Sequence, residues 1–474
     1  MFNNPDSLVV FAAGNKGTGG VASSLTSPST TKNVLTVGAS FNDHTEWLGY
    51  EYSQDIVSAD DDSRDGIKTL AGFSSRGPTE DKRLKPDVVA PGCAVTSAKG
   101  FETSTSSSSA DAHCDVQPLI GTSMACPMAA ALASKVRQYF KQGYYPRGKA
   151  VSSDGFTPSG ALIKAILVHS GQPLTYIKED ITVSTYSSSI KYPDTNQGYG
   201  RIQLNAVLNF GNDATLNPIN LFVVGASDPK SSNYQSITYS NFVKKVPYIV
   251  KFSTSSDATV VNQTPIRVTL VYTDYPAIAS STVILINKLV LTCSSDDKPY
   301  YSTGSISSAN VQVIDIMKPT VATTYTVTVT ATFLSTSALT PNKDQPFALV
   351  ITGANQYLPD DFEPSATSGY VSSADTSSSS SDFTASTSAM PFVIALTIAA
   401  AILIPMAMLA GYLAMQSYKG EEGIDDDEED DEGDESGRVR RPRSIFGCLV
   451  LLSQRSGTQS NARSQQNSNV RSTL

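Results

Sequence analysis

The pattern of apolar residues changes near residue 216, and this change limits the folds that the chain can adopt. Before it, short apolar runs such as Leu8–Gly14 and Val34–Ala39 are separated by Gly, Pro and Ser, which indicates buried strands joined by loops. Two longer stretches, Ser123–Phe140 and Ala161–His169, have the pattern of helices. Strands and helices mixed along one segment predict an open α/β sheet.

After residue 216 the sequence alternates between β-branched or aromatic residues and other types. The clearest segments are Ile266–Tyr272 and Thr324–Thr330, and such alternation is typical of half-buried antiparallel strands. Several of these segments without a helical pattern predict a β-sandwich over residues 216–356. With 474 residues and 40% hydrophobic content, the chain can form two folded domains, of which the first is expected at residues 1–215.

The C-terminal region predicts a membrane anchor. The segment Pro391–Met415 has no charged residue, so we expect a transmembrane helix at residues 390–416. A buried core helix is the alternative, but a Ser/Thr-rich stalk (357–389) precedes the segment and a charged tail (417–474) follows it. Basic residues beyond the segment predict a cytosolic tail, so the bulk of a single-pass protein faces outward or into a lumen.

The net charge of −9 resides mainly in the tail. The stretch Glu421–Glu435 holds 12 carboxylates, so the folded part is close to neutral. The folded part shows no basic stripe, which argues against nucleic-acid binding. We expect the acidic run to be solvated and disordered, and to be a candidate binding site for cytosolic trafficking factors.

The cysteines do not form a metal-binding pattern. There are five, at Cys93, Cys114, Cys126, Cys293 and Cys448, with no Cys-x-x-Cys pair and no histidine at zinc-ligand spacing. Cys93 and Cys114 flank a Ser-rich loop of the expected extracytoplasmic part. A disulfide between them and two free thiols are therefore both open alternatives.

The segment Gly121-Thr-Ser-Met-Ala-Cys-Pro127 begins the first predicted helix. A serine in the first turn lies beside unpaired backbone N–H groups and the positive end of the helix dipole, where an oxyanion is stabilised. Ser123 is therefore a candidate nucleophile. The alternative is that Thr122 and Ser123 only cap the helix, which is the commoner role for such residues.

A second segment, Ala12-Ala-Gly-Asn15, ends the first apolar run. Together the two segments resemble the nucleophile and oxyanion motifs of subtilisin-like serine proteases, the subtilase family. The resemblance implies that Ser123 attacks the scissile carbonyl, and that the Asn15 side-chain amide and the Ser123 N–H bind the oxyanion. It also implies that Ala13 and Gly14 line the substrate-binding site.

Further segments match the family in its order along the chain: Lys32–Ala39, Phe73–Pro78, Lys85–Gly92, Gly160–His169 and Gly198–Arg201. The resemblance spans residues 8–210 and implies a subtilisin-like open parallel sheet with helices on both faces. Residues 216–355 resemble more faintly the C-terminal β-sandwich of some alkaline-protease-like subtilases. Lys288 and Val290 stand where those relatives usually carry acidic residues, so we expect no calcium site, and nothing in the sequence predicts another metal or a cofactor.

The family pattern leaves the catalytic triad incomplete in this chain. The family's order is Asp, His and then Ser, so both partners should precede Asn15. Asp6 occurs there, but it lies in a turn too close to the Asn15 strand. The three histidines all follow Asn15, at His44, His113 and His169, and we expect surface or structural roles for them. Without a general base, this chain alone is expected to be inactive.

Two explanations for the incomplete triad are open. One is a truncated chain whose upstream part holds the signal, the Asp and the His, since residues 1–15 show no secretion signal. The other is a true pseudoenzyme. Truncation is favoured, because a chain that begins inside a parallel sheet would expose an unpaired strand edge.

The sequence therefore predicts a membrane-anchored serine endopeptidase that hydrolyses protein or peptide substrates through an acyl-enzyme on Ser123. The alternative is a non-catalytic pseudoprotease that acts as a cell-surface binding or adhesion module.

Overall fold

The fold is described from a computed structural model, which covers residues 1, 3–42, 66–98, 116–179, 188–189, 192–210, 220–238, 247–278, 281, 284–295, 298–301, 309–335, 344–358 and 450–451. These residues belong to one compact unit, Met1–Gly369 with Ile445–Leu474. The expected anchor, Pro391–Met415, and nearly all of the expected stalk and tail lie outside the described residues. Within the described part, no helix is long and apolar enough to cross a membrane.

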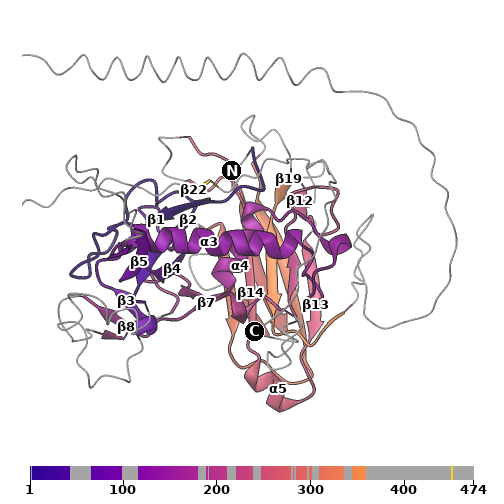
Figure 1. Ribbon diagram of the computed structural model, residues 1–474. Coiled ribbons are helices and arrows are strands. Elements are labelled where there is room, and N and C mark those ends of the chain that lie inside the picture. Colours follow the sequence, from indigo (N-terminus) through magenta and orange to yellow (C-terminus); the bar gives the residue numbers. More distant parts are fainter. Residues whose placement is uncertain are drawn as a thin grey trace, which may run out of the picture. The chain divides into compact units, whose positions relative to one another are not determined.

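A mixed sheet of nine described strands forms the first part of the fold (Figure 1). The strand order is β7-β10-β4-β2-β3-β8-β9, with β1 paired to β2 and β22 paired to β1. The strands are β1 Val9–Ala12, β2 Leu35–Ser40, β3 Thr69–Ala71, β4 Val88–Pro91, β7 Gly171–Gln172, β8 Tyr176–Lys178, β9 Ser188–Ser189, β10 Arg201–Ile202 and β22 Val450–Leu451. The pairs β1–β2, β2–β4, β4–β10 and β3–β8 are parallel, and the others are antiparallel. The sheet is therefore mixed, whereas the resemblance implied an open parallel sheet.

Two helices accompany this sheet, and glycine or serine marks their ends. Helix α3, Thr122–Lys141, begins after Gly121, which has no side chain to cap it. After the end of the helix the chain turns at Gly143, which adopts φ +70°. Helix α4, Gly160–His169, is capped by Ser159, whose hydroxyl oxygen accepts from the Leu162 N–H over 3.0 Å. All ten residues of α4 are buried, so its stability comes from packing on every side.

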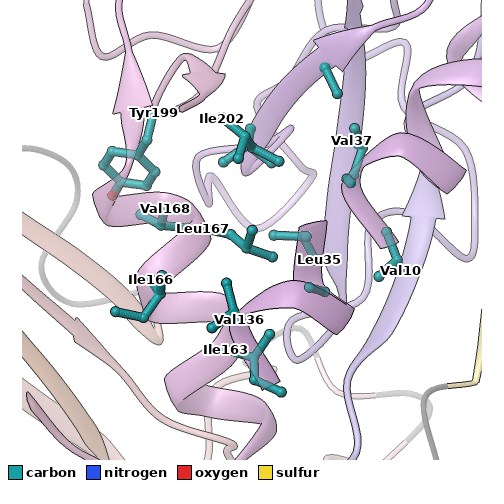
Figure 2. Packing of buried hydrophobic residues seen from close by; sticks show 14 of the residues in the cluster. Val10, Leu35, Val37, Val136, Ile163, Ile166, Leu167, Val168, Tyr199 and Ile202 are labelled. Carbon is teal, nitrogen blue, oxygen red and sulfur yellow. The ribbon is translucent and has the colours of Figure 1, made fainter. Parts of the chain in front are cut away.

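The main hydrophobic cluster lies between the helices and one face of the sheet. Leu35 and Val37 of β2 pack with Val136 of α3 and with Ile163 and Leu167 of α4 (Figure 2). Side chains alternate across a strand, so the other face carries a separate, smaller cluster: Leu70, Val89, Leu174 and Ile177. We expected helices on both faces, but the described helices α3 and α4 both join the first cluster.

The second part of the fold contains two larger antiparallel sheets that share one buried cluster. The four-stranded sheet has the order β11 Phe222–Val224, β20 Ala348–Thr352, β14 Ile266–Val271 and β17 Val311–Ile316. The five-stranded sheet has the order β16 Lys298–Tyr301, β15 Lys288–Ser295, β18 Thr324–Phe333, β13 Tyr248–Ser253 and β21 Gln356–Leu358. The alternating segments of the sequence thus form β14 and β18. The β-sandwich itself remains a prediction.

Shorter elements complete the described structure. They are the strand pairs β5 Val95–Ala98 with β6 Val116–Leu119 and β12 Ser236–Thr238 with β19 Asp344–Pro346, the 3-10 turns Gly66–Lys68, Ser152–Asp154 and Leu204–Ala206, and the helix α5 Ala258–Gln263. The alternating pattern after residue 216 did not indicate α5. Its N-terminus is capped by Asp257, whose carboxylate accepts from the Thr259 N–H over 2.8 Å.

Helix α4 joins the two parts into one core. It contacts β14 and β20, and Val271, Val313 and Val350 of the four-stranded sheet belong to the same cluster as the helix and β2. The expected boundary near residue 215 therefore does not separate two independent cores.

Residues 450–451 give an unexpected strand in the tail. Val450 and Leu451 form β22 and pair antiparallel with Val10 and Val9 of β1. The expectation that the whole tail (417–474) is disordered does not hold at these two residues.

Candidate active site

The first component of the candidate site is the turn that follows β1. Gly14 adopts φ +104°, a conformation that favours glycine. Ser75 holds the turn on both sides of Asn15: the Ser75 N–H donates to the Gly14 carbonyl over 2.8 Å, and the Ser75 hydroxyl oxygen accepts from the Lys16 N–H over 3.0 Å. The backbone at Asn15 is therefore fixed by a buried residue from a distant segment.

The second component is the N-terminus of α3, which lies against this turn. Asn15 Oδ1 accepts two hydrogen bonds from Thr122, one from its N–H over 3.0 Å and one from its hydroxyl over 2.9 Å. The same hydroxyl oxygen accepts from the Gly14 N–H over 3.1 Å. Thr122 is thus fully engaged in holding Asn15, and it is buried.

These bonds determine the orientation of the Asn15 carboxamide. Because its oxygen faces two donors, its Nδ2 group faces away from them, and a Cβ built on Gly121 would lie 3.4 Å from Nδ2. The amide group of an exposed Asn15 is therefore presented beside the start of α3. The first-turn N–H groups of a helix have no intrahelical acceptor, so Nδ2 and the Ser123 N–H are suited to bind one developing negative charge.

Ser123 is the second residue of α3 and is half-buried. The helix cap is Gly121 and no side chain caps the helix, so the alternative role of Thr122 and Ser123 as helix caps is not seen here. Pro127, four residues later, lacks an N–H, and the Ser123 carbonyl therefore lacks its usual helical donor. Among the described residues, no side chain hydrogen-bonds to the Ser123 hydroxyl.

The candidate partners of Ser123 lie elsewhere or outside the described residues. His44 and His113 are outside them. His169 is buried at the end of α4, where its Nδ1 and Nε2 each lie 2.9 Å from a threonine hydroxyl, of Thr269 and Thr352 respectively. Burial lowers the pKa of His169 well below its ordinary value, and the nearby Arg267 adds to this effect. His169 therefore has a structural position.

Asp6 is also placed away from the start of α3. Its carboxylate lies 3.8 Å from the guanidinium of Arg137, and its carbonyl accepts from the same guanidinium. Arg137 belongs to the C-terminal half of α3. This position agrees with the view that Asp6 is not a triad residue.

The other residues predicted for the site are Ala13, Gly14 and the cysteines Cys93 and Cys114. The Ala13 N–H donates to the Val37 carbonyl over 2.9 Å, and the Gly14 N–H donates to the Thr122 hydroxyl oxygen. Because both N–H groups are bound within the protein, these residues offer a substrate a surface and no free donor. Cys93 is a buried, free thiol, and burial raises its pKa. Cys114 lies outside the described residues, so the structure gives no support to a bridge between the two.

Sequence reasoning missed the two residues that hold Asn15. Thr122 was considered only as a possible helix cap, and Ser75 only as part of a turn-forming segment. A signal existed for both, since each belongs to a segment that matches the family motif. Their roles depend on contacts across 107 and 59 residues of sequence, which a motif does not specify.

A buried charge cluster lies beneath β2. Asp87 accepts from the ammonium group of Lys85 at 2.6 Å, and the ammonium group of Lys164 lies 3.1 Å away. Burial lowers the pKa of Lys85 to about 7, against the opposing effect of Asp87. The second ammonium group, that of Lys164, adds to the effect of burial and lowers the pKa of Lys85 further.

The described residues show no group of three or more His, Cys, Asp or Glu that could hold a metal ion. At the start of α3 the site presents the Ser123 hydroxyl, the first-turn N–H groups of the helix and the Asn15 amide.

Comparison with known proteins agrees with this geometry. Residues 2–200 match the model of the subtilase family. The chain is 29% identical over 378 residues to the protein named serine protease/ABC transporter B family protein tagD of Dictyostelium discoideum, covering 65% of this chain and 20% of that protein. It is 33% identical over 133 residues to the serine protease AprX of Bacillus subtilis, covering 28% of this chain and 26% of AprX.

A solved structure described as an S41 psychrophilic protease matches with 22% identity and a TM-score of 0.24, over 41% of this chain and 47% of the other. The chain spans about a fifth of the length of the tagD protein and about a quarter of that of AprX.

Proposed function

Because this chain belongs to the subtilase family, we propose that it carries the nucleophile and the oxyanion-binding groups of a serine endopeptidase. The observation that carries the proposal is the double hydrogen bond from Thr122 to Asn15 Oδ1, which presents Asn15 Nδ2 beside the α3 N-terminus. The substrates are proteins or peptides, and no cofactor takes part.

In the proposed reaction the Ser123 oxygen attacks the carbonyl carbon of the scissile peptide bond. A tetrahedral intermediate forms, and its negative oxygen accepts from Asn15 Nδ2 and from the Ser123 N–H. Collapse of the intermediate releases the amine and leaves an acyl-enzyme on Ser123, which water then hydrolyses. The donors are fixed before substrate arrives, so they need no reorganisation during the reaction.

The reaction also needs a general base, which takes the Ser123 proton during attack and gives it to the leaving amine, and a carboxylate that orients this base. The described residues place no base beside Ser123, because both ring nitrogens of His169 are bound to threonines. We propose that the base and the carboxylate come from sequence before Asn15 in a longer protein, as the family's order of Asp, His and then Ser implies. The relatives support this assignment, since the chain corresponds to only about a fifth of the length of tagD.

We further propose that Pro391–Met415 anchors the protein as a single membrane span, with the site outside the cytosol or in a lumen and the acidic tail in the cytosol, where it binds trafficking factors. The apolar, uncharged character of the segment supports the anchor. The name of the Dictyostelium relative, which pairs a serine protease with an ABC transporter, is compatible with it. The pairing of β22 with β1 argues against a cytosolic tail, because it keeps residues 450–451 on the side of the site.

A second candidate function is a non-catalytic binding module. One observation favours it, which is that no base reaches Ser123 within the described residues. This reading predicts that the site stays inert even when sequence beyond this chain is present.

Labelling with a fluorophosphonate probe distinguishes the two functions. This chain should show no labelling above a Ser123→Ala control, whereas the longer natural protein should be labelled at Ser123. Labelling of this chain that depends on Ser123 would show that a base exists within it. A longer, folded protein that carries a complete triad and resists labelling would support the binding module.

A further inference from the structure

The side chain of Lys32 ends in a cage of oxygen atoms. Its ammonium nitrogen lies 2.6 Å from Asp274 Oδ2, 2.5 Å from the Tyr275 carbonyl oxygen and 2.6 Å from the Ile284 carbonyl oxygen. All three oxygens belong to the second part of the fold, whereas Lys32 lies just before β2. The three N–H bonds of the ammonium group are therefore matched by three acceptors from a segment more than 240 residues away.

The cage has further bonds of its own. Asp274 also accepts from the Ile286 N–H over 2.7 Å and from the Asn287 N–H over 2.8 Å. Next to Lys32, Asn33 exchanges hydrogen bonds with the backbone of Asp274, over 2.8 and 3.0 Å. The Asp274 carboxylate and the Asp274 backbone are therefore held in place by bonds other than those to Lys32.

The ammonium group is almost completely removed from water. The exposed fraction of the Lys32 side chain is 6%, and that of Asp274 is 0%. Burial lowers the pKa of Lys32, even though Asp274 favours the charged form. A buried charge is tolerated only when it is paired and fully hydrogen-bonded, and this cage provides both conditions.

The composition of the cage indicates the kind of cation that it suits. One carboxylate and two carbonyl oxygens offer a single negative charge and three donor atoms. Calcium takes six to eight oxygens, so a divalent ion would be poorly coordinated here. A primary ammonium group needs three acceptors, which is the number present.

We propose that this cage is a binding site for a primary ammonium cation, and that the chain fills it with its own Lys32 side chain. The bound cation joins the segment that leads into β2 to the loop after β14, and it is one link between the two parts of the fold that can be removed. Without the Lys32 side chain, the cage takes a free alkylammonium ion. This inference does not depend on the proposed protease function.

The test measures the stability of the full chain and of its Lys32→Ala variant. Removing one partner of a buried pair leaves the other uncompensated, so the unfolding equilibrium constant should rise on the order of 10²–10³-fold. Propylammonium chloride should restore stability to Lys32→Ala in a concentration-dependent and saturable way. Tetramethylammonium chloride at the same ionic strength has no N–H donor and should not.

Two further variants act as controls. Lys32→Met fills the space of the lysine side chain with an apolar chain, so it should be destabilised and should not respond to propylammonium. In Lys32→Ala/Asp274→Asn the cage has lost its charge, and the rescue should be lost too. Equal effects of the two salts, or a Lys32→Ala variant as stable as the natural chain, would overturn the proposal.

If Lys32→Ala does not fold, its refolding from denaturant in the presence of each salt provides the same comparison. Recovery of native near-ultraviolet circular dichroism with propylammonium and not with tetramethylammonium supports the proposal. Failure of both salts contradicts it.

Discussion

Asn15 Oδ1 accepts hydrogen bonds from both the N–H and the hydroxyl of Thr122, over 3.0 and 2.9 Å. An amide side chain whose oxygen is bound twice cannot rotate its nitrogen into the same position without losing both bonds. Asn15 Nδ2 is therefore held ready to donate. This pair connects the end of β1 with the start of α3, and it explains how an exposed side chain can be preorganised.

The first prediction concerns the hydroxyl of Thr122 in the longer, active protein. Thr122→Val keeps the shape of the side chain and the N–H bond to Asn15, but it removes the two bonds of the hydroxyl, to Asn15 and from Gly14. We expect kcat to fall about tenfold while KM changes little, because roughly one hydrogen bond to the catalytic group is lost. Thr122→Ser keeps the hydroxyl and should retain most of the activity. The measurement is steady-state kinetics on a peptide substrate. Equal losses for both variants would show that shape, and not the hydroxyl, matters at this position.

The second prediction concerns Lys85 and pH. Burial lowers the pKa of Lys85 in the folded chain from its ordinary value of 10.5 to about 7. Between these values the unfolded chain binds more protons, so the free energy of unfolding should rise with pH by at most about 1.4 kcal/mol per unit for this group. Lys85→Met should show a smaller rise between pH 7 and 9.5 in urea unfolding experiments. Parallel curves for the two proteins would refute the assignment.

The third prediction concerns His169 and acid. Its pKa is lowered well below the ordinary value by burial, with Arg267 adding to the effect. Below pH 6.5 the unfolded chain gains a proton that the folded chain does not bind, so stability should fall as the solution is acidified. His169→Gln, which can still bond to both threonines, should lose less stability between pH 6.5 and pH 4.5. A variant with the same acid sensitivity as the natural chain would show that other groups cause it.

The fourth prediction concerns the membrane. If Pro391–Met415 spans a membrane as proposed, protease added to sealed vesicles should digest either the Ser123 region or an epitope placed after Leu474, but not both. Digestion of both would show that they share one side. That result would overturn the proposed orientation and agree with the pairing of β22 and β1.

Local patterns in the sequence predicted the elements that carry the site. The strand before Asn15 and the helix that begins at Thr122 follow from an apolar run and from a Gly-Thr-Ser start. The direction of β3 and the sharing of α4 between the two parts could not be predicted in this way, because both depend on partners far along the chain. The same holds for the contact of Lys32 with Asp274, since neither residue has a distinctive local pattern.

In the proposed reaction, Asn15 Nδ2 stabilises the charge that develops when Ser123 attacks. The most direct test is the kinetics of Asn15→Ala in the longer protein, with near-ultraviolet circular dichroism to verify folding. We expect kcat to fall roughly 10²-fold or more at nearly constant KM, a magnitude taken from the removal of an oxyanion donor in subtilisin. A folded Asn15→Ala enzyme with unchanged kcat would contradict the claim.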